Sequence, residues 1–174
     1  VPTHMTALSN MPAADESFTE DIRTKYVTFQ PTPKMSTYLL AFIAMEMEYI
    51  EGVDRNGIPI RAYTVPGKKE WGRFGLEVAL HALPFFADYY KIDYPLPKLD
   101  LVALPDFASG AMENWGLETF RETALLINPE EVSASAMERV ADVVAHELAH
   151  HWFGNRTTMK WFTHLWLNEG FATF

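Results

Sequence analysis

Two histidines lie four residues apart in the segment His146-Glu147-Leu148-Ala149-His150. On a helix, side chains at this spacing share one face with their Cβ atoms about 5–6 Å apart, so both imidazoles can bind one metal ion. Glu147 lies one step round the helix, where its carboxylate can reach a metal-bound water as a general base without binding the metal. The segment therefore predicts a hydrolytic metal site, although it also fits a buried helix with incidental histidines.

Glu169 is the candidate third ligand. Eighteen residues separate it from His150, which is enough for a loop and the start of a second helix. Two histidines and one carboxylate leave the fourth position of a tetrahedral zinc ion open for water, as in catalytic sites. The chain has no cysteine, so histidine and carboxylate must supply the ligands. We therefore expect one Zn²⁺ per chain, bound by His146, His150 and Glu169.

The helix that must carry the two histidines can be recognised from its apolar residues. Val140, Val143, Val144 and Leu148 recur at helical spacing. Ser133 or Ser135 can cap the start, and Gly154 is a typical stop. The pattern predicts a helix that continues to about Phe153.

The rest of the chain predicts a mixture of strands and helices. The opening part is rich in β-branched and aromatic residues, and apolar residues then recur at helical spacing from Glu70 to Tyr90, where Pro84 should kink or interrupt the helix. The predicted strands are Tyr26–Phe29, Thr37–Ile43, Leu99–Leu104 and Thr123–Ile127, with a loop over Pro105–Gly116. The change in composition places a domain boundary near residue 50.

Composition excludes several classes of protein. The net charge of -9 provides no basic surface for nucleic acid, and the 48% hydrophobic content can fill a core. The longest apolar run, Leu39–Met45, is far shorter than the roughly 20 residues that a membrane-spanning helix needs. The lack of cysteine is compatible with a cytoplasmic location. Both ends of the sequence are expected to continue into a longer protein.

A second segment, Gly110-Ala111-Met112-Glu113-Asn114, is followed by Trp115-Gly116-Leu117 and places Glu113 thirty-three residues before His146. Together with the histidine segment and Glu169, it resembles the gluzincin zinc aminopeptidases related to aminopeptidase N, most of all their puromycin-sensitive branch. The resemblance covers nearly the whole chain. It implies an α+β fold, with the end of an all-β N-terminal domain (residues 1–50) followed by the first half of a thermolysin-like zinc metallopeptidase domain (residues 51–174).

The resemblance also implies roles for the second segment. Glu113 would bind the free α-amino group of a peptide, because a carboxylate is the natural partner of an ammonium group. Gly110, Ala111, Met112 and Asn114 would complete the substrate-binding segment, with the backbone beside the peptide like an added strand. A fixed amine would place only the first peptide bond against the activated water. The expected partners are therefore peptides with a free N-terminus, and a general endopeptidase is disfavoured.

Some positions depart from the family pattern. The family often has glutamine at the position of His151 and an aliphatic residue at that of Arg156, whose charge would weaken metal binding unless it faces solvent. Trp161, Phe162 and Trp166 are expected to pack the loop between the two ligand helices. The family's transition-state tyrosine lies downstream of Phe174, so the isolated chain would lack it.

Two alternatives to an aminopeptidase remain open. The chain could be a catalytically inactive zinc-binding or peptide-binding fragment. It could also belong to a bifunctional epoxide hydrolase and aminopeptidase, which shares the zinc ligands.

Overall fold

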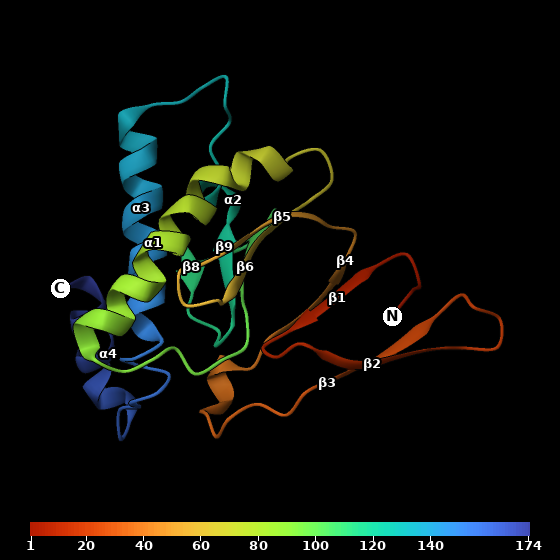
Figure 1. Ribbon diagram of the computed structural model, residues 1–174, viewed down its shortest axis with the longest axis horizontal. Helices are drawn as coiled ribbons and strands as arrows, with labels where there is room; N and C mark the ends of the chain where they lie inside the picture. The colour runs from red at the N-terminus through yellow and green to blue at the C-terminus, as the bar shows by residue number, and fades with distance from the viewer.

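A mixed five-stranded sheet forms the centre of the protein, whose residues 1–174 are all described by a computed structural model (Figure 1). Its strand order is β5-β6-β7-β9-β8. The strands are β5 (Glu48–Val53), β6 (Pro59–Thr64), β7 (Leu99–Leu104), β8 (Ala111–Met112) and β9 (Leu117–Arg121). Strands β6, β7 and β9 run parallel, whereas β5 and β8 pair antiparallel at the two edges. The short strand β8 therefore has one free edge.

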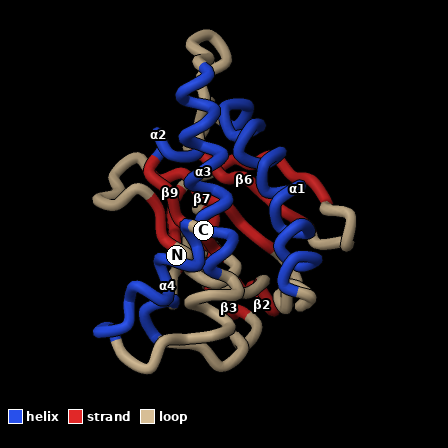
Figure 2. The backbone as a smooth tube through the Cα atoms, turned by 90° about the vertical axis from the view of Figure 1, so that its left-hand side faces the viewer, coloured by secondary structure: helices blue, strands red, loops and turns tan.

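Two long helices lie side by side over one face of this sheet (Figure 2). They are α1 (Arg73–Tyr90), which follows a 3₁₀ turn at Lys69–Gly72, and α3 (Ala134–His150). Helix α1 connects the parallel strands β6 and β7, as such a pair requires a crossover. The shorter helices are α2 (Glu122–Leu125) and α4 (Leu165–Thr173), and further 3₁₀ turns lie at Thr37–Leu39 and Phe162–His164. Helix α4 packs against α3.

The main core fills the space between the sheet and these helices. Its fully buried side chains include Leu99 and Phe120 from the sheet, Leu83 from α1, and Val144 and Leu148 from α3. Burial of such apolar surface is the dominant force that holds the layers together.

The opposite face of the sheet carries a smaller cluster, formed by Tyr63, Val102, Leu117 and Leu8. Leu8 belongs to β1 (Thr6–Ser9), which pairs with β4 (Phe42–Met45). A separate hairpin joins β2 (Ala13–Phe18) to β3 (Lys25–Phe29). The N-terminal strands therefore cover the side of the sheet that the long helices leave free.

Buried polar contacts join the N-terminal strands to the segment that precedes β9. The side chain of Asn10 donates to Trp115 O (3.0 Å), and Lys98 Nζ donates to both Ser9 O (2.8 Å) and Gly116 O (2.7 Å). Gly116 has φ +80°, and a Cβ there would lie 2.5 Å from Asn10 O. Only glycine allows this close approach. The position of residues 110–116 thus depends on the N-terminal strands as well as on the sheet.

The structure confirms several predicted elements. The predicted strand Leu99–Leu104 is β7, and Tyr26–Phe29 falls within β3. The histidine segment lies on a long helix that begins after Ser133, whose hydroxyl accepts a hydrogen bond from Ala136 N (3.2 Å). This helix ends at His150, three residues before the predicted limit.

Two predicted strands were wrong in part or completely. Thr37–Leu39 forms a 3₁₀ turn, in which the carbonyl of the buried Leu39 accepts a hydrogen bond from Asn10 Nδ2 (2.8 Å). Of the predicted strand, only Phe42 and Ile43 enter β4. Thr123–Ile127 is not a strand either, because helix α2 covers Glu122–Leu125. The strand in this part of the chain is β9, which ends just before α2. Short apolar runs suit both conformations, and packing of α2 against α3 selects the helix.

Other local expectations also changed. Helix α1 continues through Pro84, because its core-facing side chains Leu83 and Ala87 stay buried on either side of the lost hydrogen bond. The predicted loop Pro105–Gly116 contains the edge strand β8.

The expected packing of Trp161, Phe162 and Trp166 is wrong, since their side chains are 66%, 52% and 67% exposed. Their segment crosses the surface, and the closest ring to Phe162 outside it is that of Tyr38 (6.0 Å between ring centroids). None of the helices combines the length and apolar character needed to cross a membrane.

Candidate metal centre

Helix α3 ends with His146, Glu147 and His150 facing helix α4 and the end of β8. The apolar face of α3 buries Val140, Val144 and Leu148 in the main core, and this packing fixes the rotation of the helix. The side chains one turn apart on the neighbouring face then point the same way. The sequence therefore builds the candidate site on a helix that is anchored in the main core.

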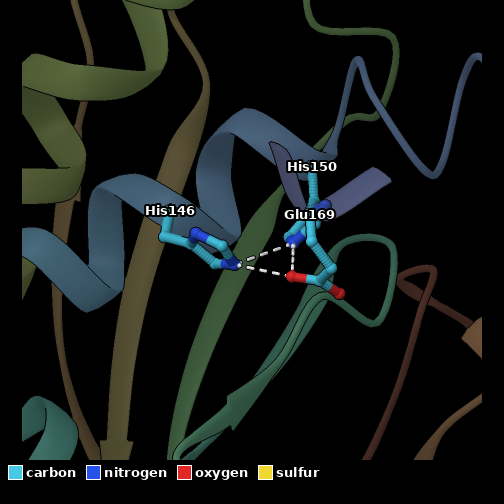
Figure 3. A group of neighbouring side chains, drawn as sticks. All are labelled: His146, His150 and Glu169. Atoms are coloured by element: carbon cyan, nitrogen blue, oxygen red, sulfur yellow. Dashed lines mark hydrogen bonds and ion pairs between the residues drawn. The ribbon is translucent and has the colours of Figure 1, made fainter. Parts of the chain in front are cut away.

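Three donor atoms converge where α3 meets α4. Nε2 of His146 lies 3.0 Å from Nε2 of His150, and Glu169 Oε2 lies 3.3 Å and 3.6 Å from these two nitrogens (Figure 3). His150 is buried, whereas Glu169 is partly exposed on α4. The predicted ligands His146, His150 and Glu169 are therefore brought together, with one side open to solvent.

The hydrogen bonds of His150 leave its Nε2 lone pair free for a cation. Nδ1 of His150 lies 2.9 Å from both Phe153 O and Asn168 Oδ1, and both of these oxygens are acceptors. Nδ1 must therefore carry the proton, which leaves Nε2 unprotonated in the neutral ring. The Nδ1 atom of His146 similarly faces a polar group, Thr173 Oγ1, at 3.5 Å, so its Nε2 also points toward the centre. Two imidazoles and one carboxylate arranged in this way fit a zinc ion.

Glu113 lies beside the same centre. Its carboxylate is buried, and Oε1 accepts hydrogen bonds from Tyr38 Oη (3.2 Å) and Asn168 Nδ2 (3.3 Å). Carboxylate oxygens of Glu113 and Glu147 and a ring nitrogen of His150 all lie within 4.8 Å of one another. The carboxylate predicted to bind an amine and the carboxylate predicted to act as a base thus meet at the metal ligands.

The other residues of the second segment have different surroundings. Gly110 precedes β8, which Ala111 and Met112 form, and β8 pairs with β9 through Ala111 and Met112. The side chain of Asn114 donates to Leu39 O (3.3 Å) and accepts from Thr119 Oγ1 (3.0 Å). The backbone of β8 can therefore meet a peptide along its free edge, whereas both polar atoms of the Asn114 side chain are used within the chain.

Burial and neighbouring charges determine the electrostatics of the site. Burial raises the pKa of Glu147 to about 9, and the carboxylates of Glu118, Glu113 and Glu169 add to this rise. The pKa of His146 is lowered by burial and by the nearby His150. Both shifts oppose charge in the protein alone. A bound divalent cation would offset the raised pKa of Glu147, because it stabilises the carboxylate, and it would add to the lowering of the pKa of His146, because it favours the neutral imidazole that can bind metal. The site is thus arranged for a cation.

Three residues that contact the site were not predicted to do so. Tyr38 and Asn168 hold the carboxylate of Glu113, and Asn155 Nδ2 donates to Glu113 O (2.9 Å). The only available signal was that Asn155 and Asn168 stand close in sequence to the ligands.

Arg156 and His151, the two departures from the family pattern, lie in opposite environments. Arg156 is exposed and faces solvent, which meets the condition under which its charge leaves the metal site undisturbed. His151 is fully buried, and its Nε2 lies 2.7 Å from Glu118 Oε1. Burial lowers the pKa of His151 to about 3 and raises that of Glu118 well above its usual range, so both groups are driven toward their neutral forms.

Comparison with known proteins adds to this geometry. The model of the peptidase family M1 domain matches residues 74–174, more than half of the chain, and the model of the peptidase M1 N-terminal domain matches residues 1–39. The chain belongs to peptidase family M1. The resemblance seen in the sequence is thus confirmed, as is the α+β combination of an N-terminal domain with the start of a peptidase domain.

Similar proteins in this family are aminopeptidases. A puromycin-sensitive aminopeptidase from Caenorhabditis elegans and aminopeptidase M1-A from Oryza sativa subsp. japonica are each 55% identical over 174 residues, which is 100% of this chain and 18% and 20% of the relatives. Aminopeptidase N from Rattus norvegicus is 51% identical over 176 residues, with 99% of the chain and 18% of the relative covered. The chain thus spans about a fifth of the length of these M1 relatives. Peptidases of this family are metallopeptidases, which agrees with the donor set on α3 and α4.

Gly154 is expected to be essential for the geometry of the metal centre. Its φ is +127°, and a Cβ there would clash with Oδ1 of Asn168, which holds His150. We expect Gly154→Ala to weaken zinc affinity by about 10- to 100-fold, as loss of an outer hydrogen-bond partner does. Zinc titration against a competing chelator would measure this change.

Gly57→Ala is the matched control for this substitution. Gly57 has φ +86° but nothing within 4 Å of the added Cβ. It therefore reports backbone strain without a clash, and should keep its zinc affinity. Equal zinc affinity in both variants would contradict the role given to Gly154.

Proposed function

We propose that the protein is a zinc-dependent aminopeptidase that hydrolyses the first peptide bond of peptides with a free N-terminus. The observation that carries this proposal is the meeting of two sets of groups. His146, His150 and Glu169 place their donor atoms within 3.6 Å of one another, and the buried Glu113 lies beside Glu147 and His150. Metal ligands, a base and an amine anchor are therefore adjacent.

A zinc ion held by the three ligands would supply a Lewis acid that polarises the scissile carbonyl and lowers the pKa of water. Glu147 accepts a proton from the attacking water as its oxygen bonds to the carbonyl carbon. The carbon–nitrogen bond then breaks, and Glu147 returns the proton to the leaving amine. One proton thus moves from water to the new N-terminus, and Glu147 is unchanged at the end of the cycle.

Glu113 would make the reaction an exopeptidase reaction. Its carboxylate is held by Tyr38 and Asn168, so a peptide ammonium group can pair with it at a fixed place. Asn168 also bonds His150, which ties the amine anchor directly to a metal ligand. The free edge of β8, with Gly110, Ala111 and Met112, would bind the peptide backbone as an added strand. Only the first peptide bond then lies against the reacting water.

We further propose the division of the chain into residues 1–50, from a β-rich N-terminal domain, and residues 51–174, from a thermolysin-like catalytic domain. The two family models match on either side of this boundary, at 1–39 and 74–174. A cytoplasmic location stays a prediction from the absence of cysteine.

The proposal is tested on the complete gene product, purified and assayed for metal. We expect one zinc per chain, hydrolysis of an alanyl fluorogenic amide, and no hydrolysis of its N-acetylated form. Zinc binding without hydrolysis of either substrate would favour a binding protein. Opening of an epoxide substrate alongside aminopeptidase activity would favour the bifunctional alternative.

Glu113→Ala should lower kcat/KM for the alanyl substrate by about 10- to 100-fold, because a hydrogen bond to a charged group contributes about 1.5–3 kcal/mol. Discrimination against the acetylated substrate should fall, while zinc content stays at one. The exposed Glu130 provides a matched control, Glu130→Ala, with unchanged kinetics. Unchanged kinetics in Glu113→Ala would remove the amine-binding role.

A further inference from the structure

A buried polar pair lies beneath the candidate site and takes no part in the proposed reaction. Glu118 on β9 and His151, the first residue after α3, are both fully buried, with Oε1 and Nε2 2.7 Å apart. The pair therefore joins the sheet to the end of the metal-binding helix. The Tyr94 and His151 rings pack nearly perpendicular to each other, with 5.1 Å between centroids.

The other nitrogen of His151 continues toward Glu113. Nδ1 of His151 lies 3.3 Å from Asn155 Nδ2, and the same Nδ2 donates to Glu113 O at 2.9 Å. An amide NH₂ group has two protons and no acceptor, so it can satisfy both partners at once. His151 Nδ1 must then be the acceptor, and its Nε2 carries the proton that faces Glu118. Donors and acceptors are therefore matched from His151 Nδ1 through Asn155 Nδ2 to the carbonyl of Glu113.

This arrangement is unfavourable as a purely structural device. Neither carboxylate oxygen of Glu118, nor Nε2 of His151, has an aligned hydrogen-bond partner, although the two groups touch. Buried polar atoms without aligned partners destabilise a fold, and well-packed apolar residues of similar volume often stabilise it more. Exceptions of this kind in a native core call for an explanation. The position of the Glu118–His151 pair suggests an explanation, because its contacts continue through Asn155 to the backbone of Glu113, the proposed amine anchor.

We propose that Glu118 and His151 are positioning residues that hold Asn155 against the carbonyl of Glu113, and so fix the distance between the substrate ammonium group and the metal. This inference rests on the proposed function. Tyr38 and Asn168 hold the side-chain carboxylate of Glu113 by hydrogen bonds. The buried series Glu118–His151–Asn155 holds the backbone carbonyl of the same residue. A small displacement of such an anchor is enough to lower the rate of a reaction that depends on alignment.

The test compares two inhibitors of the complete zinc-loaded gene product. Alanine hydroxamate and propionohydroxamate bind metal through the same group and differ only in the α-amino group. The ratio of their inhibition constants therefore measures the contribution of the amine. A large ratio in the natural protein that collapses in Glu113→Ala establishes the amine anchor. A ratio near one in the natural protein overturns the anchor itself, and with it this inference.

Three variants then test the pair. His151→Met with Glu118→Leu replaces it by apolar side chains, which should fold and retain zinc but reduce the inhibitor ratio about tenfold, since alignment of the amine is lost. The inhibition constant of propionohydroxamate for this variant should stay within about twofold of that for the natural protein, because the hydroxamate still binds the zinc ion. His151→Gln keeps an acceptor for Asn155 and a donor for Glu118, and should restore most of the ratio.

The outcome that overturns the inference is an unchanged inhibitor ratio in a folded, zinc-loaded double variant. Equal weakening of both hydroxamates would also overturn it, because the pair would then support the metal site or the fold in general. If the double variant fails to fold, His151→Met alone is compared with His151→Gln. These two side chains have similar length and volume, and only glutamine provides the polar atoms. An equal ratio in the two would contradict the positioning role.

Discussion

Glu147→Gln is expected to lower kcat by about 10²–10⁴-fold, the range that a positioned general base contributes. Glutamine has nearly the same shape as glutamate but cannot accept the proton of the attacking water. Glu147 is buried beside His150, but its carboxylate is not one of the three groups expected to bind zinc, which are His146, His150 and Glu169. Zinc content should therefore stay at one per chain. Stopped assays with an alanyl substrate, paired with metal analysis, would measure both quantities.

The matched control for this prediction lies on the same helix. Glu138 is exposed on α3, two turns before the histidine segment, so Glu138→Gln changes the charge by the same amount away from the site. We expect its kcat to stay within about twofold of the natural value, as surface substitutions usually have small effects. A fall in kcat of the same size in both variants would show that Glu147 acts through the charge of the helix. Loss of zinc in Glu147→Gln would assign it to metal binding.

The elements that the sequence predicted correctly are those with a strong local signal. The strand Leu99–Leu104 is apolar except for Asp100 and is buried on both faces along nearly its whole length, so its pattern has one simple explanation. Helix α3 combines a serine cap, a repeating apolar face and a glycine with φ +127° shortly after its end. Such agreement between independent local signals makes an element predictable.

The elements that were missed depend on distant partners. Strand β9 follows a turn at Gly116, whose conformation is set by close contact with Asn10. The turn at Thr37–Leu39 has its final carbonyl bound by Asn10, and β8 is only two residues long. No pattern within these short segments records a contact with a residue about 30 or 100 positions away. Tertiary contacts therefore decided their conformation.

The same distinction applies to the candidate site. His146 and His150 were found because helical spacing alone places them on one face. Glu169, on a different helix, was recognised from its distance in sequence and from the choice of ligands, and the structure brings it to within 3.6 Å of both histidines. Tyr38 stands 75 residues before Glu113, and no spacing rule connects the two.

The supporting contacts show why a site of this kind is more than its ligands. Asn168 lies one residue before Glu169 and bonds both His150 and Glu113, so one side chain links the metal ligands to the amine anchor. Gly154 is required to leave room for that side chain. Asn168 and Gly154 have no recognisable role in the sequence alone, because their roles depend on how α3 and α4 pack together.

His150→Phe is expected to abolish stoichiometric zinc binding and to lower kcat/KM by at least about a thousandfold, because a metal supplies several kcal/mol of transition-state stabilisation. His150 is the buried ligand, with its Nε2 3.0 Å from His146 Nε2. Chelation of the natural protein should have the same effect, and added zinc should reverse it. The exposed His81 on α1 provides the control His81→Phe, which should keep both zinc and activity.

Thermal unfolding adds a readout that does not depend on turnover. A metal that binds the folded protein and not the unfolded chain raises Tm by mass action. The effect should be large here, since the cation also offsets the repulsion among the carboxylates of Glu113, Glu147 and Glu169. Zinc should therefore raise the Tm of the natural protein and of His81→Phe, but not that of His150→Phe. A zinc-dependent rise in His150→Phe, with activity retained, would place the metal elsewhere and refute the ligand set.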